Sequence, residues 1–232
     1  MPEHHFARQP QLGTEPPPLV LEELLQRLDE LGLLTPLLAA VHMTQLTAGE
    51  ISLLAGRGVS VVHCPESNLK LASGFCPVAD LAAAGINIAL GTDGASSNND
   101  LDMFGEMRSC ALLAKGVAQR ADAAPAATVL GMATLNGAKA LGLGDRIGSL
   151  VTGKEADVIC VDLSAAATQP AYDPVSQLVD APSRDHVSDV WVAGRQLLAD
   201  HQPLVADAPA ILARAESWRA RLSAARGSVA HD

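Results

Sequence analysis

Three residues whose side chains bind metal ions or move protons each follow a short apolar run of the kind that forms a buried strand. They are His42 after residues 38–41, His63 after residues 59–62, and Asp93 after residues 86–90. Strands of one parallel sheet would bring these side chains to the same C-terminal edge, where barrel enzymes build their active sites. A neutral imidazole and a carboxylate are good ligands for Zn²⁺ or Fe²⁺, and such a carboxylate can take a proton from bound water. The spacing is therefore compatible with a catalytic metal site, in which the second histidine hydrogen-bonds the reacting group.

A plainer interpretation of the same residues stays open. A single histidine at a strand end is more often a hydrogen-bonded structural residue than a ligand. An aspartate followed by glycine, as Asp93 is by Gly94, is more typical of a turn. Spacing alone does not decide between the two interpretations.

The segments around these residues alternate between helical and strand-like patterns. Helices are predicted at residues 19–34, from Thr47 to near Gly58, and at residues 77–84, 102–115 and 123–141. Thr47 followed by Glu50 has the pattern of a capping box, in which two side chains satisfy N–H groups at the start of a helix. Continuous apolar strands separated by helices indicate an α/β fold with a parallel sheet covered on both faces. We predict that this part covers residues 19–144.

The two ends of the chain differ from this part. Residues 1–18 are polar and rich in proline, which opposes helix formation, and they are predicted to be a disordered or unrelated leader. Residues 145–232 are predicted to form a small β module with a terminal helix at 208–225. The predicted strands of the module are residues 156–163, 187–192 and 195–198, the last two as a β-hairpin.

Composition narrows the classes of partner. With 48% hydrophobic and 18% charged residues, the 232-residue chain has the balance of an ordinary globular protein. Its net charge of −10 argues against nucleic acid or an anionic membrane as the main partner. There is no apolar run of transmembrane length and no hydrophobic signal core, so a cytoplasmic location is expected. The four cysteines lack Cys-x-x-Cys spacing and are predicted to be free thiols in a reducing compartment.

Several stretches of the chain resemble the amidohydrolase superfamily. They are residues 41–46 (VHMTQL), 63–74 (HCPESNLKLASG), 91–99 (GTDGASSNN), 132–138 and 148–157. Within the superfamily, the chain is similar to the triazine-hydrolase-like branch, which includes deaminases of 5′-methylthioadenosine and S-adenosylhomocysteine. The resemblance covers roughly Leu24 to Leu198. It implies the C-terminal part of a metal-dependent (β/α)₈ barrel of the TIM type, followed by a small β module and a terminal helix.

The resemblance also implies a reaction and roles for particular residues. The reaction is hydrolysis of a C–N bond, in which metal-activated water deaminates an adenine-type ring. One divalent metal ion, zinc with iron as the alternative, is implied to bind His42 and Asp93. Asp93 is implied to act also as the general base, and His63 to contact the attacking hydroxide and the substrate ring. Gln45, His63 and Asp93 are the implied substrate-binding residues. The expected partner is a purine nucleoside or a related heterocycle, and homo-oligomers are a further implication.

The chain departs from the family pattern in two places. Gln45 stands where the deaminases usually have a substrate-binding glutamate that also acts as an acid, and an amide cannot donate a proton in that way. The His-x-His ligand pair of the first barrel strand is absent from the sequence. His4 and His5 are adjacent, whereas alternate strand residues are needed to aim two rings at one metal ion. Residues 19–144 are also about half of the roughly 250 residues that a complete barrel takes.

These departures leave competing hypotheses. The first is the metal-dependent deaminase, with chlorotriazines or other amino-substituted heterocycles as alternative substrates. The second is a truncated, catalytically inactive fragment, or a subunit completed by another polypeptide, since open sheet edges favour pairing. The third is a small-molecule binding module without turnover.

Some polar residues are expected mainly to shape the loops after His63 and Asp93, namely Ser67, Asn68, Lys70, Ser97 and Asn98.

Overall fold

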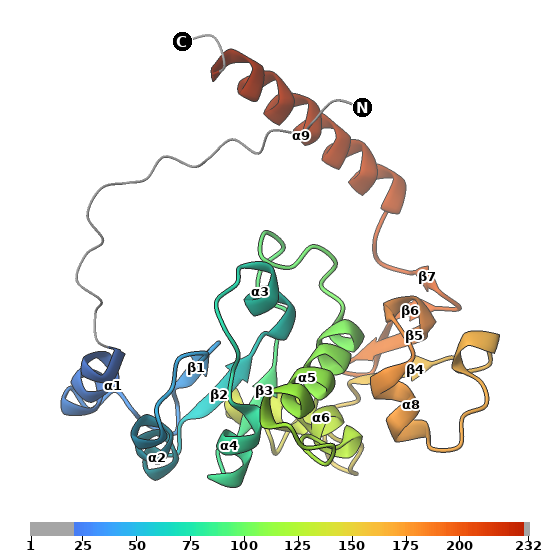
Figure 1. Ribbon diagram of the computed structural model, residues 1–232. Coiled ribbons are helices and arrows are strands. Elements are labelled where there is room, and N and C mark those ends of the chain that lie inside the picture. The colour runs from blue at the N-terminus through green and yellow to red at the C-terminus, as the bar shows by residue number, and fades with distance from the viewer. Residues whose placement is uncertain (1–20, 230–232) are drawn as a thin grey trace.

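A three-stranded parallel sheet lies at the centre of the α/β part of the chain (Figure 1). The computed structural model describes residues 21–229, and the side chains of residues 24–223. Strands β1 (Ala39–Val41), β2 (Ser60–His63) and β3 (Ile88–Leu90) follow one another in that order across the sheet. Val41 pairs with Val62, and His63 pairs with Leu90. The predicted parallel sheet of short apolar strands is confirmed.

Helices connect these strands and pack around them. They are α1 (Leu21–Glu30), α2 (Ala48–Arg57), α3 (Pro65–Lys70), α4 (Val78–Ala83), α5 (Met103–Ala118), α6 (Ala126–Met132) and α7 (Leu135–Ala140). Helix α7 packs against β2 and β3, whereas α5 packs against α3, α4 and α6. Helix α3 follows β2 directly and lies near one end of the sheet, beside the loop that precedes α5 (Figure 1).

Local sequence signals fix the ends of helix α2. The Glu50 N–H donates to Thr47 Oγ1 at 3.3 Å, and the Thr47 N–H donates to Glu50 Oε2 at 2.7 Å, so the predicted capping box is confirmed. The helix ends at Gly58, whose φ of 67° is left-handed and therefore favours glycine. These caps set where the chain turns back into β2.

The hydrophobic core lies between the sheet and its helices. Leu54, Val61, Leu81, Cys110 and Val129 are completely buried and belong to one cluster. Fully burying an aliphatic side chain contributes about 1.5–3 kcal/mol. The sheet that carries the candidate site therefore contributes to the hydrophobic core of the described chain.

A second sheet, four-stranded and antiparallel, follows the α/β part. Its strands are β4 (Val158–Val161), β5 (Val187–Val192), β6 (Arg195–Ala199) and β7 (Gln202–Pro203). The predicted hairpin is confirmed, since Val192 pairs with Arg195. The residues of these strands are half-buried or exposed, in contrast to β2 and β3. Helix α8 (Pro174–Asp180) packs against α5 and α6 and joins the two parts.

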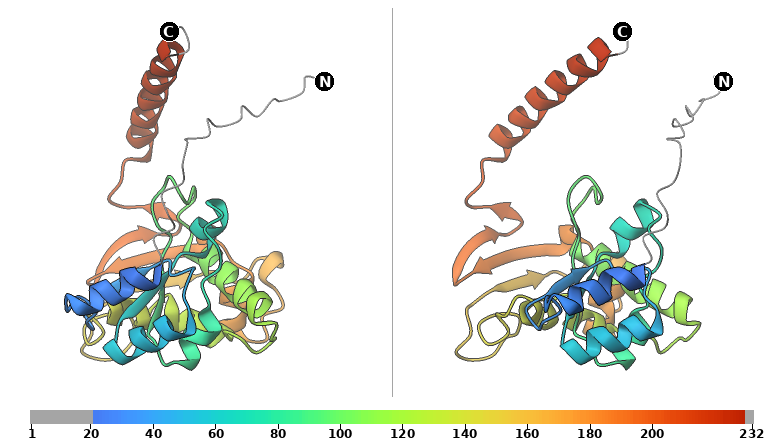
Figure 2. Two further views of the ribbon diagram at one scale, coloured as in Figure 1. Left: turned by 60° about the vertical axis from the view of Figure 1, so that its left-hand side comes forward. Right: turned by 90° about the vertical axis from the view of Figure 1, so that its left-hand side faces the viewer.

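The last described element is a long helix, α9 (Ala208–Val229), which stands away from the body of the molecule (Figure 2). Its described side chains are exposed. Within residues 21–229, none of the helices has the length and apolar character needed to span a membrane. The predicted leader at residues 1–18, with His4 and His5, lies outside the described residues.

Two predictions about local structure were wrong. Residues 123–141 form two helices, α6 and α7, because the backbone of Thr134 (φ −129°, ψ −95°) is not helical. This break lets the start of α7 reach the sheet, where Asn136 Nδ2 donates to Ile88 O at 2.9 Å and Asn87 Nδ2 donates to Asn136 O at 3.1 Å. The segment after His63, predicted as a loop, is helix α3.

Candidate active site

The C-terminal edge of the parallel sheet brings together the three residues that the sequence singles out. His42 follows β1, His63 is the last residue of β2, and Asp93 lies just beyond the end of β3. The His42 N–H donates to Val62 O at 2.9 Å, and the Gly91 N–H donates to His63 O at 3.0 Å. These ladder bonds continue past the strands, so the ends that carry the three side chains are held in register.

The backbone is strained at two of these positions. His42 has a φ of 70° and Asp93 a φ of 62°, both in the left-handed region that residues other than glycine rarely adopt. Such conformations cost about 1–3 kcal/mol each and persist only where the surrounding structure enforces them. Strain of this kind is common at active sites and ligand clamps, and the two predicted metal ligands are among the ten described non-glycine residues with a positive φ.

The Asp93 carboxylate is held by hydrogen bonds from two elements. Its Oδ2 accepts from Ser67 Oγ of α3 at 2.8 Å and from Ser97 Oγ of the following loop at 2.6 Å. These two hydroxyl bonds, joined by one from the Gly94 N–H, lower the pKa of Asp93 to about 2. The carboxylate is therefore ionised at neutral pH, as a metal ligand or a general base must be.

His42 and Asp93 face each other across the sheet edge. His42 Nε2 lies 3.9 Å from Asp93 Oδ2, and the two side chains are 40% and 34% exposed. Because zinc lies about 2.0–2.2 Å from nitrogen and oxygen ligands, one ion can contact two atoms this far apart. The pair fits two ligand positions of a divalent metal ion.

These two residues do not complete a metal site by themselves. Catalytic zinc is usually held by three protein ligands. Among the side chains that the structure describes, no group of three or more His, Cys, Asp or Glu residues is arranged to hold a metal ion. A full coordination shell therefore needs ligands beyond those that the described residues supply.

His63 is buried, unlike His42 and Asp93. The residue is 2% exposed, and burial, reinforced by the nearby charge of His42, lowers its pKa to about 4. The imidazole is therefore neutral at pH 7 and has one N–H donor and one acceptor nitrogen. Its Nδ1 is buried and has no hydrogen-bond partner among the described residues.

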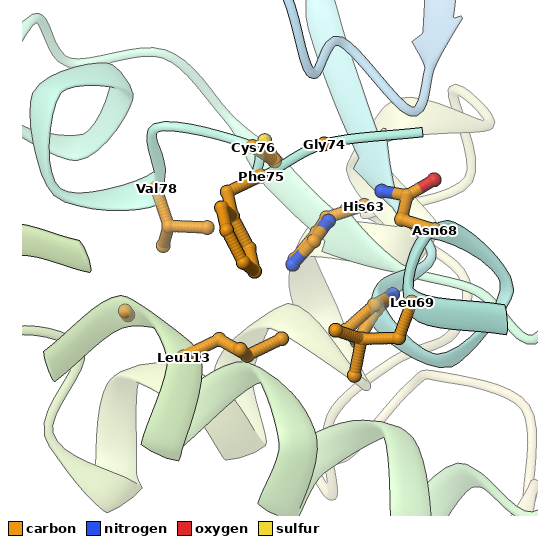
Figure 3. A pocket seen from close by; sticks show the side chains of 10 residues that line it. His63, Asn68, Leu69, Gly74, Phe75, Cys76, Val78 and Leu113 are labelled. Atoms are coloured by element: carbon orange, nitrogen blue, oxygen red, sulfur yellow. The ribbon is translucent and has the colours of Figure 1, made fainter. Parts of the chain in front are cut away.

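A small pocket of about 10 Å³ borders His63 (Figure 3). Its lining comes from α3, from the segment that leads into α4, and from α5. The apolar walls are formed by Leu69, Phe75, Cys76, Val78 and Leu113. Burial raises the pKa of the Cys76 thiol to about 12, so this cysteine acts as a packing residue. The neutral ring of His63 thus lies against a largely apolar wall.

Gln45 lies on the turn after β1 and is exposed. Its Nε2 donates to Ser73 O at 3.2 Å, and Thr44 Oγ1 donates to the same oxygen at 2.8 Å. The amide therefore ties this turn to the segment after α3, which forms part of the pocket. Its predicted role in substrate binding stays a prediction.

Four of the five polar residues that were predicted to shape the loops make the expected hydrogen bonds. Ser67 and Ser97 hold Asp93, as described above. Lys70 Nζ donates to Ser96 O at 2.8 Å, and Asn98 Oδ1 accepts from the Leu101 N–H at 2.9 Å. The exception is Asn68, whose side-chain amide has no partner among the described residues.

A buried acidic network behind the Asp93 loop was not predicted. Glu106 is 0% exposed, and its carboxylate accepts from Asn98 Nδ2 at 2.6 Å and from the Glu66 N–H at 3.2 Å. Burial and the charge of Glu66 raise the pKa of Glu106 to about 7, against the effect of these hydrogen bonds. The sequence signal is the position of Glu106 next to Met107 in the buried stripe of α5, where a carboxylate is rare unless paired.

Comparison with known proteins gives one family. The sequence profile of the amidohydrolase family matches residues 20–197. A 5-methylthioadenosine/S-adenosylhomocysteine deaminase of Teredinibacter turnerae is 54% identical over 202 residues, which cover 87% of this chain and 46% of that protein.

Two solved structures extend this comparison. The crystal structure of an adenosine deaminase from Xanthomonas campestris with bound zinc is 58% identical, with a TM-score of 0.85 over 86% of this chain and 46% of that one. The atrazine chlorohydrolase of Arthrobacter aurescens complexed with zinc is 28% identical, with a TM-score of 0.77 over 83% of this chain and 43% of that one. The chain thus spans about half the length of the relatives that it matches.

Proposed function

The chain belongs to the amidohydrolase family, and we propose that it carries half of the active site of a metal-dependent deaminase acting on an adenine-type ring. The observation that carries this proposal is the pair of strained, facing residues His42 and Asp93, 3.9 Å apart at the edge of the sheet. The high identity to the deaminases supports it. We propose likewise that the parallel sheet is the C-terminal part of a (β/α)₈ barrel, followed by residues 145–232 as a separate β module with a terminal helix.

The proposed reaction replaces the exocyclic amine of the ring by oxygen and releases ammonia. A divalent metal ion, when bound, would lower the pKa of water and polarise the site. His42 and Asp93 are the residues that would hold it. The zinc in the related structures favours zinc over iron.

Asp93 is suited to the work of a general base. Its carboxylate is ionised, fixed by two hydroxyls, and one-third exposed, so it can accept a proton from an attacking water. Protonation of the leaving amine is the second proton transfer that the reaction needs. Gln45, as an amide, cannot supply that proton, so another group or water must carry it.

His63 is suited to bind the substrate rather than to titrate. A buried neutral imidazole can donate one hydrogen bond to a developing oxyanion or ring nitrogen, and it does so without bringing a charge. The purine nucleosides named for the related deaminase are the proposed substrate class. A cytoplasmic location and assembly into homo-oligomers stay predictions.

A second substrate class has support from one observation. The likeness to atrazine chlorohydrolase, at 28% identity and a TM-score of 0.77, makes hydrolysis of a substituted triazine the second candidate, with less support than the deaminase at 54–58% identity. Both reactions displace a ring substituent with water, so the same residues serve either. The leaving group distinguishes them, as ammonia in one case and chloride in the other.

The test is to load the purified full chain with zinc and to measure bound metal, ammonia release from 5′-methylthioadenosine, and chloride release from atrazine. Stoichiometric zinc with ammonia release supports the deaminase. Chloride release alone would support the triazine hydrolase. A folded chain that binds zinc but turns over neither substrate would contradict catalysis by this chain alone, and an aggregated chain without metal would support the inactive fragment.

A further inference from the structure

Asn68 is the least satisfied polar residue near the candidate site. It lies on α3 with a side chain that is 3% exposed, and both its Nδ2 and its Oδ1 are buried without a hydrogen-bond partner among the described residues. The adjacent Ser67, also completely buried, donates to Asp93. On the same helix, therefore, one buried polar side chain has a hydrogen-bond partner and its neighbour, Asn68, has none among the described residues.

A buried amide with no partner is costly, since it has lost its hydrogen bonds to water. Native proteins leave few such groups, and each one calls for a bound water, an ion or a ligand. His63 Nδ1 is a second buried atom of the same kind. The two residues border the same pocket, and Figure 3 shows the imidazole between the side chains of Phe75 and Asn68.

The pocket has the size and the polar groups for a single water molecule. Its volume is about 10 Å³, close to the volume that one water needs. Three unsatisfied atoms belong to its lining residues, namely Nδ1 of His63 and Nδ2 and Oδ1 of Asn68. Buried waters typically make about two to four hydrogen bonds, and a water at His63 Nδ1 can bond one of the two amide atoms of Asn68. A purine ring is far too large for this space, so the pocket is not the substrate cavity.

We propose that this pocket is a buried water site, in which one water molecule joins the side-chain amide of Asn68 to Nδ1 of His63. Asn68 is then a positioning residue, because it acts on the reacting groups only through His63. Phe75 and Leu113 contribute apolar walls to the same pocket.

The proposed water would influence which of the two ring nitrogens of His63 carries the proton. A neutral imidazole carries its proton on one nitrogen, and the partner of that nitrogen decides what the other nitrogen offers. A water held at Nδ1 therefore determines whether Nε2 donates or accepts. The catalytic importance of this choice rests on the proposed function, whereas the water site itself does not.

A high-resolution crystal structure of the full chain without substrate tests the water site. We expect one ordered water within hydrogen-bond distance of His63 Nδ1 and of the Asn68 amide. A dry pocket, or a direct hydrogen bond between His63 and Asn68, would overturn the proposal. This measurement does not depend on turnover, so it separates the proposal from the proposed deaminase activity.

Nitrogen-15 NMR of labelled histidine tests the role of Asn68. Asn68→Leu removes the amide and keeps the bulk, so we expect the His63 tautomer ratio to change about fivefold, the effect of losing one ordinary hydrogen bond. Leu113→Val is the control, because it alters the same pocket without removing a polar atom. An unchanged ratio in Asn68→Leu, or an equal change in both variants, would refute the positioning role. If Asn68→Leu does not fold, the crystal structure decides.

Discussion

Asp93 and His63 lie at the ends of neighbouring strands, yet their surroundings are opposite. Asp93 is one-third exposed, and hydroxyls from Ser67 and Ser97 hold its carboxylate with a pKa of about 2. His63 is 2% exposed against an apolar wall, has a pKa of about 4, and finds no partner for Nδ1 among the described residues. One residue is fixed by hydrogen bonds and the other by packing.

The difference shows how one sheet edge can supply two kinds of chemistry. Hydrogen bonds to the charged form keep a carboxylate ionised, and desolvation keeps an imidazole neutral. Helix α3 serves both, since Ser67 faces Asp93 and the next residue, Asn68, borders the pocket of His63. Substitutions on the two sides should therefore have different signatures.

The largest effect is expected from Asp93→Asn. The change removes both a ligand charge and the proposed base. In any version of the protein whose metal site is complete, we expect loss of zinc binding and a fall in ammonia release of about 10²–10⁴-fold, typical for a positioned base. Zinc titration and an ammonia assay measure the two effects. Asp122→Asn, in an exposed ion pair with Arg120, is the matched control and should retain both properties. A near-normal rate in Asp93→Asn would rule out the assigned role.

The second-largest effect is expected on the free energy of unfolding, from Glu106 in the buried acidic network behind the Asp93 loop. The pKa of Glu106 is about 7 in the folded chain against 4.5 as the ordinary value, so its ionisation opposes folding. The cost is absent below pH 4.5, grows as the pH rises, and is complete above pH 7, where it amounts to about 3 kcal/mol. Burial of the carboxylate is the largest cause of this cost. Glu66 and Asp100 add to it by repulsion, whereas the Glu66 N–H and Asn98 reduce it.

Glu106→Gln should therefore flatten the fall in the free energy of unfolding between pH 4.5 and 7, which urea titrations at several pH values measure. Glu216→Gln on α9 is the control. The pKa of Glu216 is lowered by Arg219, so the control should not flatten the fall. Equal slopes in the wild-type chain and in Glu106→Gln would contradict the raised pKa.

The sequence predicted the parts of this arrangement that depend on local patterns. The strand ends before His42, His63 and Asp93 were recognisable because a buried parallel strand is a short apolar run. The capping box at Thr47 needs only residues close in sequence. The catalytic and binding roles of these residues stay predictions.

Other parts depend on contacts between distant segments and were missed. The pocket of His63 needs α3, the segment before α4 and α5 to meet, and no local pattern encodes that meeting. The break at Thr134 was missed because the helical pattern of the sequence continues across it. The contact that accompanies the break, from Asn136 of α7 to Ile88 of β3, joins residues far apart in sequence. Glu106 could have been noticed, since its carboxylate interrupts a buried helical stripe.

A smaller effect is expected when the hydroxyls of Ser67 and Ser97 are removed together. In the metal-free Ser67→Ala, Ser97→Ala chain, the pKa of Asp93 should rise from about 2 toward 3.8, because its two largest stabilising bonds are gone. Carbon-13 NMR of the carboxyl groups during an acid titration measures this. Ser52→Ala, whose hydroxyl bonds Ala48 O on α2, is the control and should leave Asp93 unchanged. A pKa that stays near 2 would show that the hydroxyls do not hold the carboxylate.

The smallest effect, and the one that bears on the His63 side, is expected from Gln45→Glu. The amide of Gln45 donates to Ser73 O, next to Gly74 and Phe75 of the pocket, and an ionised carboxylate cannot donate there. We expect a change of about fivefold, the effect of losing one hydrogen bond, in the ratio of kcat/KM for two purine nucleosides, or a new ionisation in the pH profile.

Gln45→Met, which lacks both the donor and the charge, separates the two causes. A shift shared by both variants would reflect the lost bond to Ser73, and one confined to Gln45→Glu would reflect an acid at this position. If neither variant changes the selectivity or the pH profile, Gln45 does not occupy the position of the acid, and the pocket side of the site is independent of the turn after β1.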